Sequence, residues 1–306
     1  MLLPHFRLPI FHVAFHAFAS AAGCRARAAS AAALRFPRLR LAPHGIRGGR
    51  GRRLVGADRL GARLVAAMSA PVAIELTDAS FGWHGHAALK SVSGRFAAGG
   101  MTAVVGPNGA GKSTLIKGIM GVLRPMTGSV RVTGAGRAGL AWLPQAAELD
   151  RSFPVSVLEL AAMGAWRRVG GWRRIGDEEL ARCMHALETV GLADLAGHGV
   201  GTLSGGQMQR ALFARMLVQD APVLLLDEPF AAVDSHTADE LMALLCGLHG
   251  QGRTVIAVLH DLDLVRDHFP ECLLLSGSVV AWGDTATALD DAHLKLARQW
   301  LAGGRA

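Results

Sequence analysis

The feature that most constrains this chain is the run GPNGAGKST, which follows the short β-rich run MTAVV at residues 101–105 and precedes an amphipathic helical pattern. A strand, a loop and a helix with the spacing G-x-x-x-x-G-K-[S/T] over residues 106–113 are typical of a loop that binds nucleoside triphosphates. The glycines let backbone N–H groups converge on phosphate oxygens, and the following helix presents its positive end. Kinases, GTPases, helicases and motors share this loop, so it predicts a nucleotide site without specifying what the energy drives.

Two side chains of this phosphate loop have predictable roles. Lys112 should reach the β- and γ-phosphates, and Ser113 offers a hydroxyl to Mg²⁺, with Thr114 beside it. The whole run supplies candidate nucleotide contacts, namely Gly106, Pro107, Asn108, Gly109, Ala110, Gly111, Lys112, Ser113 and Thr114.

Two further apolar runs end in polar residues. Val223 to Leu226 are continuously apolar, as in a strand buried on both faces of a parallel sheet, and Asp227 and Glu228 follow. Ligands bind at the carboxyl ends of such strands. Asp227 is therefore the expected Mg²⁺ partner, through water, and Glu228 the expected general base for an attacking water. The run RTVIAVLHDLD predicts another strand, ending near His260, which could contact the γ-phosphate.

A second glycine pair opens a predicted helix in LSGGQMQR, residues 203–210. Paired glycines at a helix start allow an anion to approach the backbone closely. Ser204, Gly205, Gly206 and Gln207 are therefore candidates for a second phosphate contact.

The charge of the chain is unevenly distributed. The net charge is +8, yet residues 1–67 hold 12 arginines, no lysine and one acid, and the remainder holds 20 basic and 23 acidic residues. A mildly acidic body argues against a nucleic-acid partner. Four scattered cysteines, Cys24, Cys183, Cys246 and Cys272, indicate neither a disulfide framework nor a zinc site.

Residues 1–67 differ in composition from the rest of the chain, because they are rich in Ala, Arg and Gly and show no sustained hydrophobic periodicity. The apolar residues 8–23 resemble a secretory or lipoprotein signal, and the arginines an organellar transit peptide. We prefer a third interpretation, in which Met68 is the true start, because strand-like alternation begins there. The predicted domain then spans 68–306. No segment after Met68 has 18 uninterrupted apolar residues, so no membrane span is expected.

The region between the phosphate loop and LSGGQ predicts an inserted helical subdomain at about 146–200. Within it, DEELARCMHALETVG reads as a helix, with Leu180, Cys183, Met184, Leu187 and Val190 on one stripe and Gly191 as its stop. The run RRVGGWRR, residues 167–174, is expected to be an exposed basic loop. Beyond His260, CLLLSGSVVAWGD predicts a hairpin with a turn near Gly277, followed by a final helix.

The motifs GPNGAGKST, LPQ, LSGGQ, LLLDEP and the His of LHD occur in this order, and with them residues 71–300 resemble an ABC-type ATP-binding cassette. The resemblance implies an α/β fold: a P-loop NTPase core of RecA-like type with a mostly parallel sheet, a small antiparallel β subdomain and an inserted helical subdomain. It implies ATP as substrate, with Mg²⁺.

The resemblance also assigns roles that residue chemistry leaves open. Gln145 would touch Mg²⁺ and the catalytic water, with its loop contacting the membrane partner. Asp234 would exchange contacts between two cassettes, and Ser204 to Gln207 would meet the γ-phosphate of ATP held by the second cassette. Trp83 is expected to stack on adenine, in preference to Phe81, although such cassettes more often carry Tyr there and this chain has none.

The short segment after His260 and the run DRSFPVSVLELAAMG look most like the ATPase subunits of zinc and manganese importers. The implied partners are a second cassette in a homodimer, integral membrane permease subunits and, indirectly, a periplasmic or extracellular substrate-binding protein. The implied location is the cytoplasmic face of the inner membrane. An importer of iron chelates or haem, an exporter and a soluble cassette in iron–sulfur cluster assembly are the alternatives.

Overall fold

The computed structural model describes residues 72–134, 136–146, 150–170 and 174–303 of the chain, with side chains up to residue 299. The chain divides into two units, Met1–Met68 and Ser69–Ala306, and all described residues belong to the second. The interpretations of residues 1–67 and of a start at Met68 lie outside the described residues. None of the helices in the described ranges is long and apolar enough to cross a membrane.

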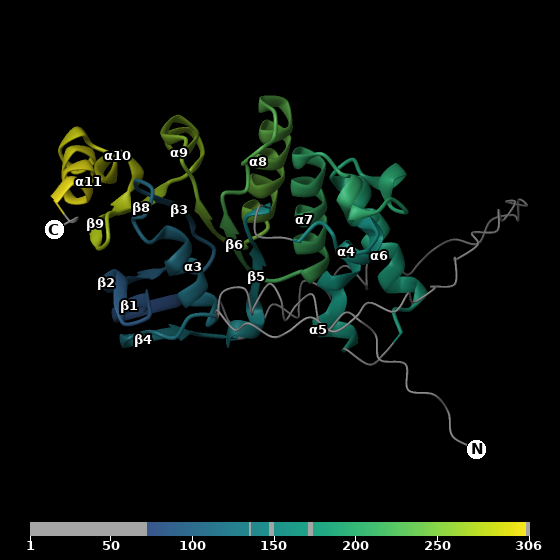
Figure 1. The fold of residues 1–306 in the computed structure, drawn as a ribbon, viewed down its shortest axis with the longest axis horizontal. Coiled ribbons are helices and arrows are strands. Elements are labelled where there is room, and N and C mark those ends of the chain that lie inside the picture. Colours follow the sequence, from purple (N-terminus) through teal and green to yellow (C-terminus); the bar gives the residue numbers. More distant parts are fainter. Residues whose placement is uncertain (1–71, 135, 147–149, 171–173, 304–306) are drawn as a thin grey trace, which may run out of the picture. The chain divides into compact units, whose positions relative to one another are not determined.

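The second unit is built from both strands and helices (Figure 1). They are β1 (Ile74–Trp83), β2 (His86–Phe96), β3 (Met101–Val105), α3 (Lys112–Met120), β4 (Thr127–Val132), β5 (Leu140–Leu143), α4 (Val157–Ala162), α5 (Trp166–Val169), α6 (Asp177–Thr189), α7 (Gly205–Gln219), β6 (Val223–Asp227), α8 (Ser235–Gly250), β7 (Thr254–Val258), α9 (Leu262–His268), β8 (Glu271–Leu275), β9 (Val279–Asp284), α10 (Thr285–Ala288) and α11 (Asp291–Gly303).

The described strands form two sheets. The larger has the order β5-β6-β7-β3-β8-β9, parallel except for the antiparallel β8–β9 pair, and the smaller is antiparallel in the order β2-β1-β4. The prediction of an α/β fold with a mostly parallel sheet and a small antiparallel sheet is confirmed. The predicted hairpin is β8–β9, with Gly277 between the strands at φ +74°.

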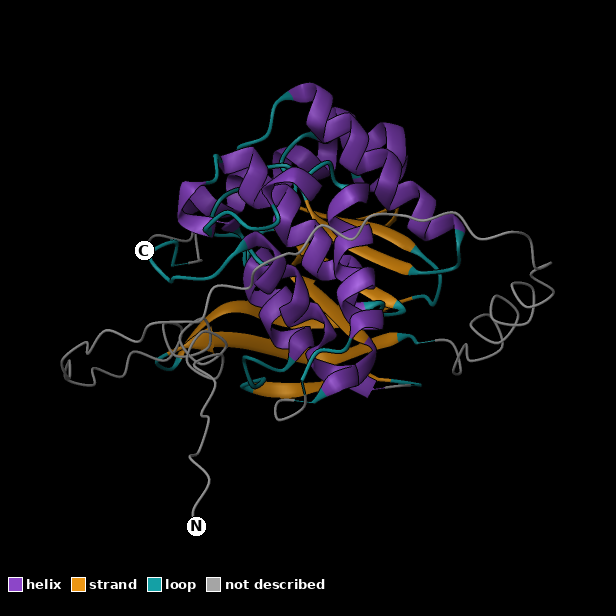
Figure 2. Cartoon of the chain, turned by 90° about the vertical axis from the view of Figure 1, so that its right-hand side faces the viewer, coloured by secondary structure: helices purple, strands orange, loops and turns teal. Residues whose placement is uncertain are grey.

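The central strands are buried on both faces because their side chains alternate between two apolar cores. In β6, Leu224 and Leu226 enter the core lined by α4, α6, α7 and α8, whereas Val223 and Leu225 enter the core shared with α3 and the small sheet. Helix α3 thus lies between the two sheets, and α7 and α8 contact the larger sheet from its opposite face, with α4 and α6 packed on α7 (Figures 1 and 2).

The segment between β5 and α7 is mainly helical. Helix α4 begins with a capping box, in which Ser156 accepts from the Glu159 N–H and Glu159 accepts from the Ser156 N–H. Backbone bonds from Val157 N–H to His198 O at 2.9 Å and from Val200 N–H to Val155 O at 2.9 Å bring the two ends of the segment together. Helices α4 and α6 also pack on α7. The subdomain boundary at about 146–200 stays a prediction.

Two expectations for this segment need correction. Leu180 was expected on the apolar stripe of α6, but it is 38% exposed, while Cys183 and Leu187 are buried. In the predicted exposed basic loop, residues 167–169 belong to the short helix α5 rather than to a loop, although Arg167, Arg168 and Arg174 are exposed as expected. Residues 171–173 lie outside the described residues.

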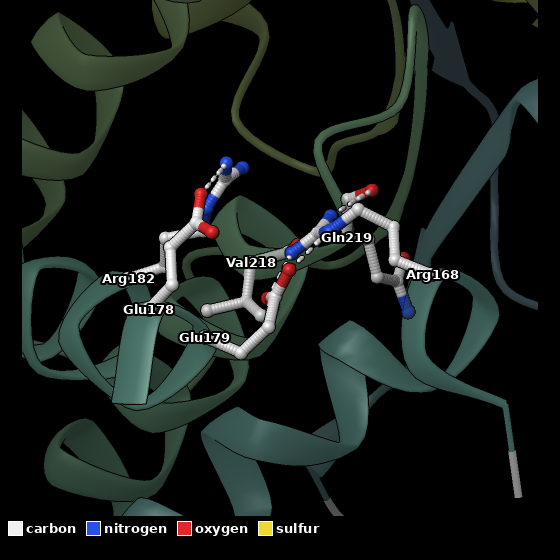
Figure 3. A network of polar contacts seen from close by, with 6 residues as sticks. All are labelled: Arg168, Glu178, Glu179, Arg182, Val218 and Gln219. Carbon is white, nitrogen blue, oxygen red and sulfur yellow. Dashed lines mark hydrogen bonds and ion pairs between the residues drawn. The ribbon is translucent and has the colours of Figure 1, made fainter. Parts of the chain in front are cut away.

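Arg168 explains why the basic run is not simply solvated (Figure 3). Its guanidinium donates to both carboxylate oxygens of Glu179 at 3.0 and 2.8 Å and to the carbonyl of Val218 at 2.7 Å. One side chain therefore ties α5 to α6 and to the carboxyl end of α7.

Candidate functional site

The phosphate loop joins β3 to α3 through glycines in the left-handed region, where other residues are disfavoured. Gly106, Gly109 and Gly111 have φ values of 146°, 83° and 92°. A Cβ at Gly106 would overlap the Leu275 carbonyl, whereas a Cβ at Gly109 would meet none of the described residues within 4 Å. Asn108 and Gly109 are exposed. The loop is therefore firmly supported on its inner side and open on its outer side, as a cradle for phosphate oxygens requires.

Lys112 is folded into this loop. Its ammonium donates to the carbonyls of Gly106 at 2.8 Å and of Pro107 at 3.1 Å, and the residue is 6% exposed. Burial lowers the pKa of Lys112 from its ordinary value, against the opposing effect of the carboxylates of Glu228 and Asp227. A phosphate at the loop would offer this cation charged acceptors in place of neutral carbonyls.

Ser113 and Asp227 meet although they lie 114 positions apart in the chain. The Ser113 hydroxyl donates to Asp227 Oδ1 at 3.0 Å, and Asp227 is fully buried at the end of β6. Gln145 comes two residues after β5, whose Leu143 lies opposite Leu226 of β6. Hydroxyl, carboxylate and amide oxygens are the donors that Mg²⁺ takes, so the residues present fit this ion.

Glu228 and His260 form a close pair at the same edge of the sheet. His260 Nε2 lies 2.6 Å from Glu228 Oε1, and the two residues follow the adjacent strands β6 and β7. Glu228 has φ +52°, a left-handed backbone that costs a non-glycine residue about 1 kcal/mol. The pair is partly exposed. A carboxylate held by an imidazole and open to solvent can accept a proton from water.

The candidate residues of LSGGQ cap a helix. Ser204 accepts from the Gln207 N–H, and the Gln207 side chain accepts from the Ser204 N–H, which closes a capping box on α7. Asp234 similarly caps α8 through Thr237, and these bonds lower the Asp234 pKa. The described side-chain hydrogen bonds of Ser204, Gln207 and Asp234 are all made within the helix end that each residue caps. None of these bonds connects the three residues to the phosphate loop of the same chain.

The structure separates the two aromatic candidates. Phe81 is fully buried, in contact with Gly118 of α3, whereas Trp83 is partly exposed at the end of β1. Trp83 therefore has a ring surface available to a ligand, and Phe81 does not. Its role in stacking on adenine stays a prediction.

Sequence reasoning missed two supports of the site. The turn at Gly277 donates to the Ala110 carbonyl at 3.1 Å and accepts from the Lys90 N–H at 2.8 Å, which braces the phosphate loop against β2. Gln209, fully buried in α7, donates to the Pro229 carbonyl at 2.8 Å. A polar residue on the apolar side of α7, beside Met208 and Ala211, was the available signal for Gln209. No comparable signal marked Gly277, because its two bonds are made by the backbone.

Comparisons with known proteins agree with this geometry. The family described as ABC transporter matches residues 89–231. The zinc transport system ATP-binding protein TroB of Treponema pallidum (strain Nichols) is 38% identical over 229 residues, covering 74% of this chain and 86% of the relative. The manganese transport system ATP-binding protein MntB of Bacillus subtilis (strain 168) is 37% identical over 216 residues, covering 69% of this chain and 86% of the relative.

Solved structures give the same result. A dimeric bacterial ABC transporter cassette matches with a TM-score of 0.62 at 27% identity, covering 69% of this chain and 98% of that one. A dimeric post-hydrolysis cassette bound to ADP and Pi matches with a TM-score of 0.62 at 26% identity, over 69% and 98% of the two chains. With the phosphate loop, the Ser113–Asp227 contact and the Glu228–His260 pair, these similarities show that the chain belongs to the ABC transporter family, as one of its nucleotide-binding ATPase cassettes.

Proposed function

We propose that this chain is the ATP-hydrolysing subunit of an importer that takes up a metal ion, zinc or manganese. The observation that carries the hydrolytic part is the Glu228–His260 pair, 2.6 Å apart at the sheet edge where Ser113 meets Asp227. The names of the relatives, which are zinc and manganese transport systems, support the cargo.

The chain's own groups account for binding and proton transfer. Residues 106–111 hold phosphate oxygens through backbone N–H groups, and Lys112 turns from its loop carbonyls to the β- and γ-phosphates. Ser113 and Asp227, with Gln145, would hold Mg²⁺, which supplies charge neutralisation on the phosphates when bound. Glu228 accepts the proton of the attacking water while His260 orients the carboxylate and contacts the γ-phosphate. Trp83 stacks on the adenine.

The active unit in this proposal is a homodimer. Ser204, Gly205, Gly206 and Gln207 meet the γ-phosphate of ATP held by the second copy, and Asp234 contacts that copy. Their position at exposed or half-buried helix starts supports this assignment, because a helix N-terminus attracts anions. Permease subunits anchor the dimer at the cytoplasmic face of the membrane, and a substrate-binding protein outside delivers the metal.

The Glu228→Gln variant tests the hydrolytic assignment. It keeps the shape of the side chain but removes the base, so ATP should bind and remain trapped while turnover falls at least about 100-fold. The exposed Glu240 of α8 offers a matched control, because Glu240→Gln leaves the sheet edge untouched. Turnover of Glu228→Gln at the wild-type rate would refute the base assignment.

The cargo needs a separate experiment with the complete transporter. Membrane vesicles carrying this chain, its permease and its binding protein should accumulate radiolabelled zinc or manganese when ATP is present on the cassette side. Accumulation of a sugar or a haem, without either metal, would overturn the assignment of cargo and leave the ATPase assignment intact.

A further inference from the structure

Gln209 is a buried polar residue that the proposed reaction does not use. It is fully buried in α7, where Met208, Ala211 and Leu212 are also buried. Its Nε2 donates to the Pro229 carbonyl, but its Oε1 is buried without a hydrogen-bond partner among the described residues. Leaving such an oxygen unpaired costs about 1–3 kcal/mol. Packing alone would therefore favour an apolar side chain at this position.

The partner of Gln209 adjoins the proposed base. Pro229 directly follows Glu228, whose backbone is left-handed at φ +52°, and Ala232 is left-handed as well at φ +61°. Two bonds from different elements hold this segment. The Glu228 N–H donates to Val258 O of β7 at 3.2 Å, and Gln209 binds Pro229 O from α7 at 2.8 Å. The direction of the Glu228 side chain thus depends on a backbone conformation that α7 helps to hold.

The amino end of α7 also contacts the chain a few residues beyond Pro229. A Cβ at Gly205 would lie 3.2 Å from Ala232 Cβ, and one at Gly206 would lie 3.6 Å from the Ala232 carbonyl. The amino end of α7 therefore packs against residues 232–233, while Gln209, one helical turn further on, binds Pro229. The helix start that would meet the second copy's ATP is thereby joined to the segment that carries Glu228.

We propose that Gln209 is a positioning residue, which couples the position of α7 to the orientation of the Glu228 carboxylate in the same chain. This inference rests on the proposed function of Glu228 as the base. When the start of α7 binds a γ-phosphate, the Gln209–Pro229 hydrogen bond keeps the residues after β6, including Glu228, in a fixed position relative to α7. Each copy's base is then oriented by the helix that senses the other copy's ATP.

The Gln209→Met variant removes the donor at nearly constant volume. Turnover by the full-length chain should fall at least about tenfold, since small misplacements of catalytic groups cost rates of this order, while KM and ATP binding stay within about twofold. Gln219→Met is the matched control, because Gln219 (labelled in Figure 3) is the last residue of α7. Its side-chain oxygen is also buried, with no hydrogen-bond partner in the part of the chain that the structure describes. That control should keep wild-type turnover.

The Gln209→Glu variant separates positioning from packing. Burial raises the pKa of the introduced carboxyl, which can donate to the Pro229 carbonyl when protonated but not when ionised. Its turnover relative to wild type should therefore rise as the pH is lowered from about 9 to 6, whereas the relative turnover of Gln209→Met stays constant. Dividing by the wild-type rate at each pH corrects for titration of Glu228, His260, Asp227 and Lys112 in the same site.

The outcomes distinguish the two levels of the proposal. Wild-type kcat in Gln209→Met, or a relative rate of Gln209→Glu that does not change with pH, would overturn the positioning role. If Glu228→Gln is inactive in the same assay, the proposed base survives that result. If Glu228→Gln itself turns over normally, the proposed function fails first, and the inference about Gln209 fails with it.

Discussion

At the scale of single residues, the site depends on groups whose position is specified by a close neighbour. Lys112 is held by two loop carbonyls, Ser113 by Asp227, and Glu228 by His260. Each contact is also one that a bound nucleotide or water would rearrange. The side chains are therefore pre-positioned, and for Lys112 a bound phosphate would replace neutral carbonyl acceptors with charged ones.

Replacement of Lys112 should abolish nucleotide binding. Lys112→Ala removes the cation from the phosphate loop, and no other described lysine donates to that loop's carbonyls, so ATP affinity should fall at least about 100-fold in titration calorimetry. Lys117→Ala, on the same helix, should bind ATP as the wild type does. Equal affinities of the two variants would contradict the assigned role.

Two glycines of similar helical context should respond in opposite ways to alanine. A Cβ at Gly118 of α3 would overlap the buried ring of Phe81, whereas a Cβ at Gly247 of α8 would have no described residue within 4 Å. Gly118→Ala should lower the free energy of unfolding by about 1–3 kcal/mol. Gly247→Ala should raise it by up to about 1 kcal/mol through helix propensity. Urea unfolding of both variants checks the pair, and destabilisation of the same size would contradict the packing argument.

At the scale of elements, α7 is the helix on which the helical segment is organised. Its amino end carries the capping box of Ser204 and Gln207, and Gln209 binds Pro229. Its carboxyl end accepts from Arg168, which also binds Glu179 of α6 (Figure 3). Displacement of the helical segment would therefore be transmitted along α7 to residues beside Glu228.

The Arg168–Glu179 contact predicts a pH dependence of stability. The hydrogen bond and charge of Arg168 hold the pKa of Glu179 below its usual range. A lowered folded-state pKa stabilises the protein above the unfolded pKa of about 4.3, and the contribution is lost as pH falls through the folded pKa. At pH 7, Glu179→Gln should cost about 1 kcal/mol, and its Tm difference from wild type should shrink below about pH 4.

Glu178 provides the control for this measurement. Its carboxylate pairs with Arg182 at 2.9 Å on the surface of α6, with 80% of its side chain exposed. Such pairs contribute about 0.3–0.5 kcal/mol. Glu178→Gln should therefore change Tm little at any pH, and a larger effect than that of Glu179→Gln would contradict the assignment.

At the scale of the whole molecule, Ser204 and Gln207 of LSGGQ form hydrogen bonds at the start of α7, and Asp234 does so at the start of α8, within a single chain. A second copy is the proposed source of the phosphate that they would meet. The dimeric cassettes among the structural relatives support this arrangement. ATP bound between two copies would then link association to nucleotide occupancy.

A charge at Ser204 should separate binding from association. In the Glu228→Gln background, Ser204→Arg should leave ATP binding by the monomer unchanged but prevent the ATP-dependent dimer, measured by light scattering, because the arginine fills the proposed interface. In the otherwise wild-type chain it should also suppress turnover. Ser156→Arg breaks the corresponding capping box of α4 and should still dimerise. Dimerisation of the Ser204 variant would contradict the composite site.

Local chemistry made much of this protein predictable. The phosphate loop, the buried strand before Asp227, the helix stop at Gly191 and the hairpin around Gly277 follow from spacing, periodicity and glycine conformation over a few residues. The order of parallel strands is not local. Serine and aspartate 114 positions apart, glutamate and histidine 32 apart, and Gln209 and Pro229 20 apart meet through long-range packing.

The sequence alone therefore determined which chemical groups this chain brings to a site: a phosphate-binding loop, side-chain oxygens that fit Mg²⁺, and the carboxylate that we propose as the base. The tertiary structure decided which of these groups are in contact. It also decided that Phe81 is buried in the core while Trp83 is partly exposed, and that Arg168 binds Glu179. The physical reason is the distance along the chain over which the interactions act. Backbone conformation and capping depend on neighbours a few residues away, whereas the placement of α7 beside β6 and β7 depends on the apolar surface that the whole unit buries.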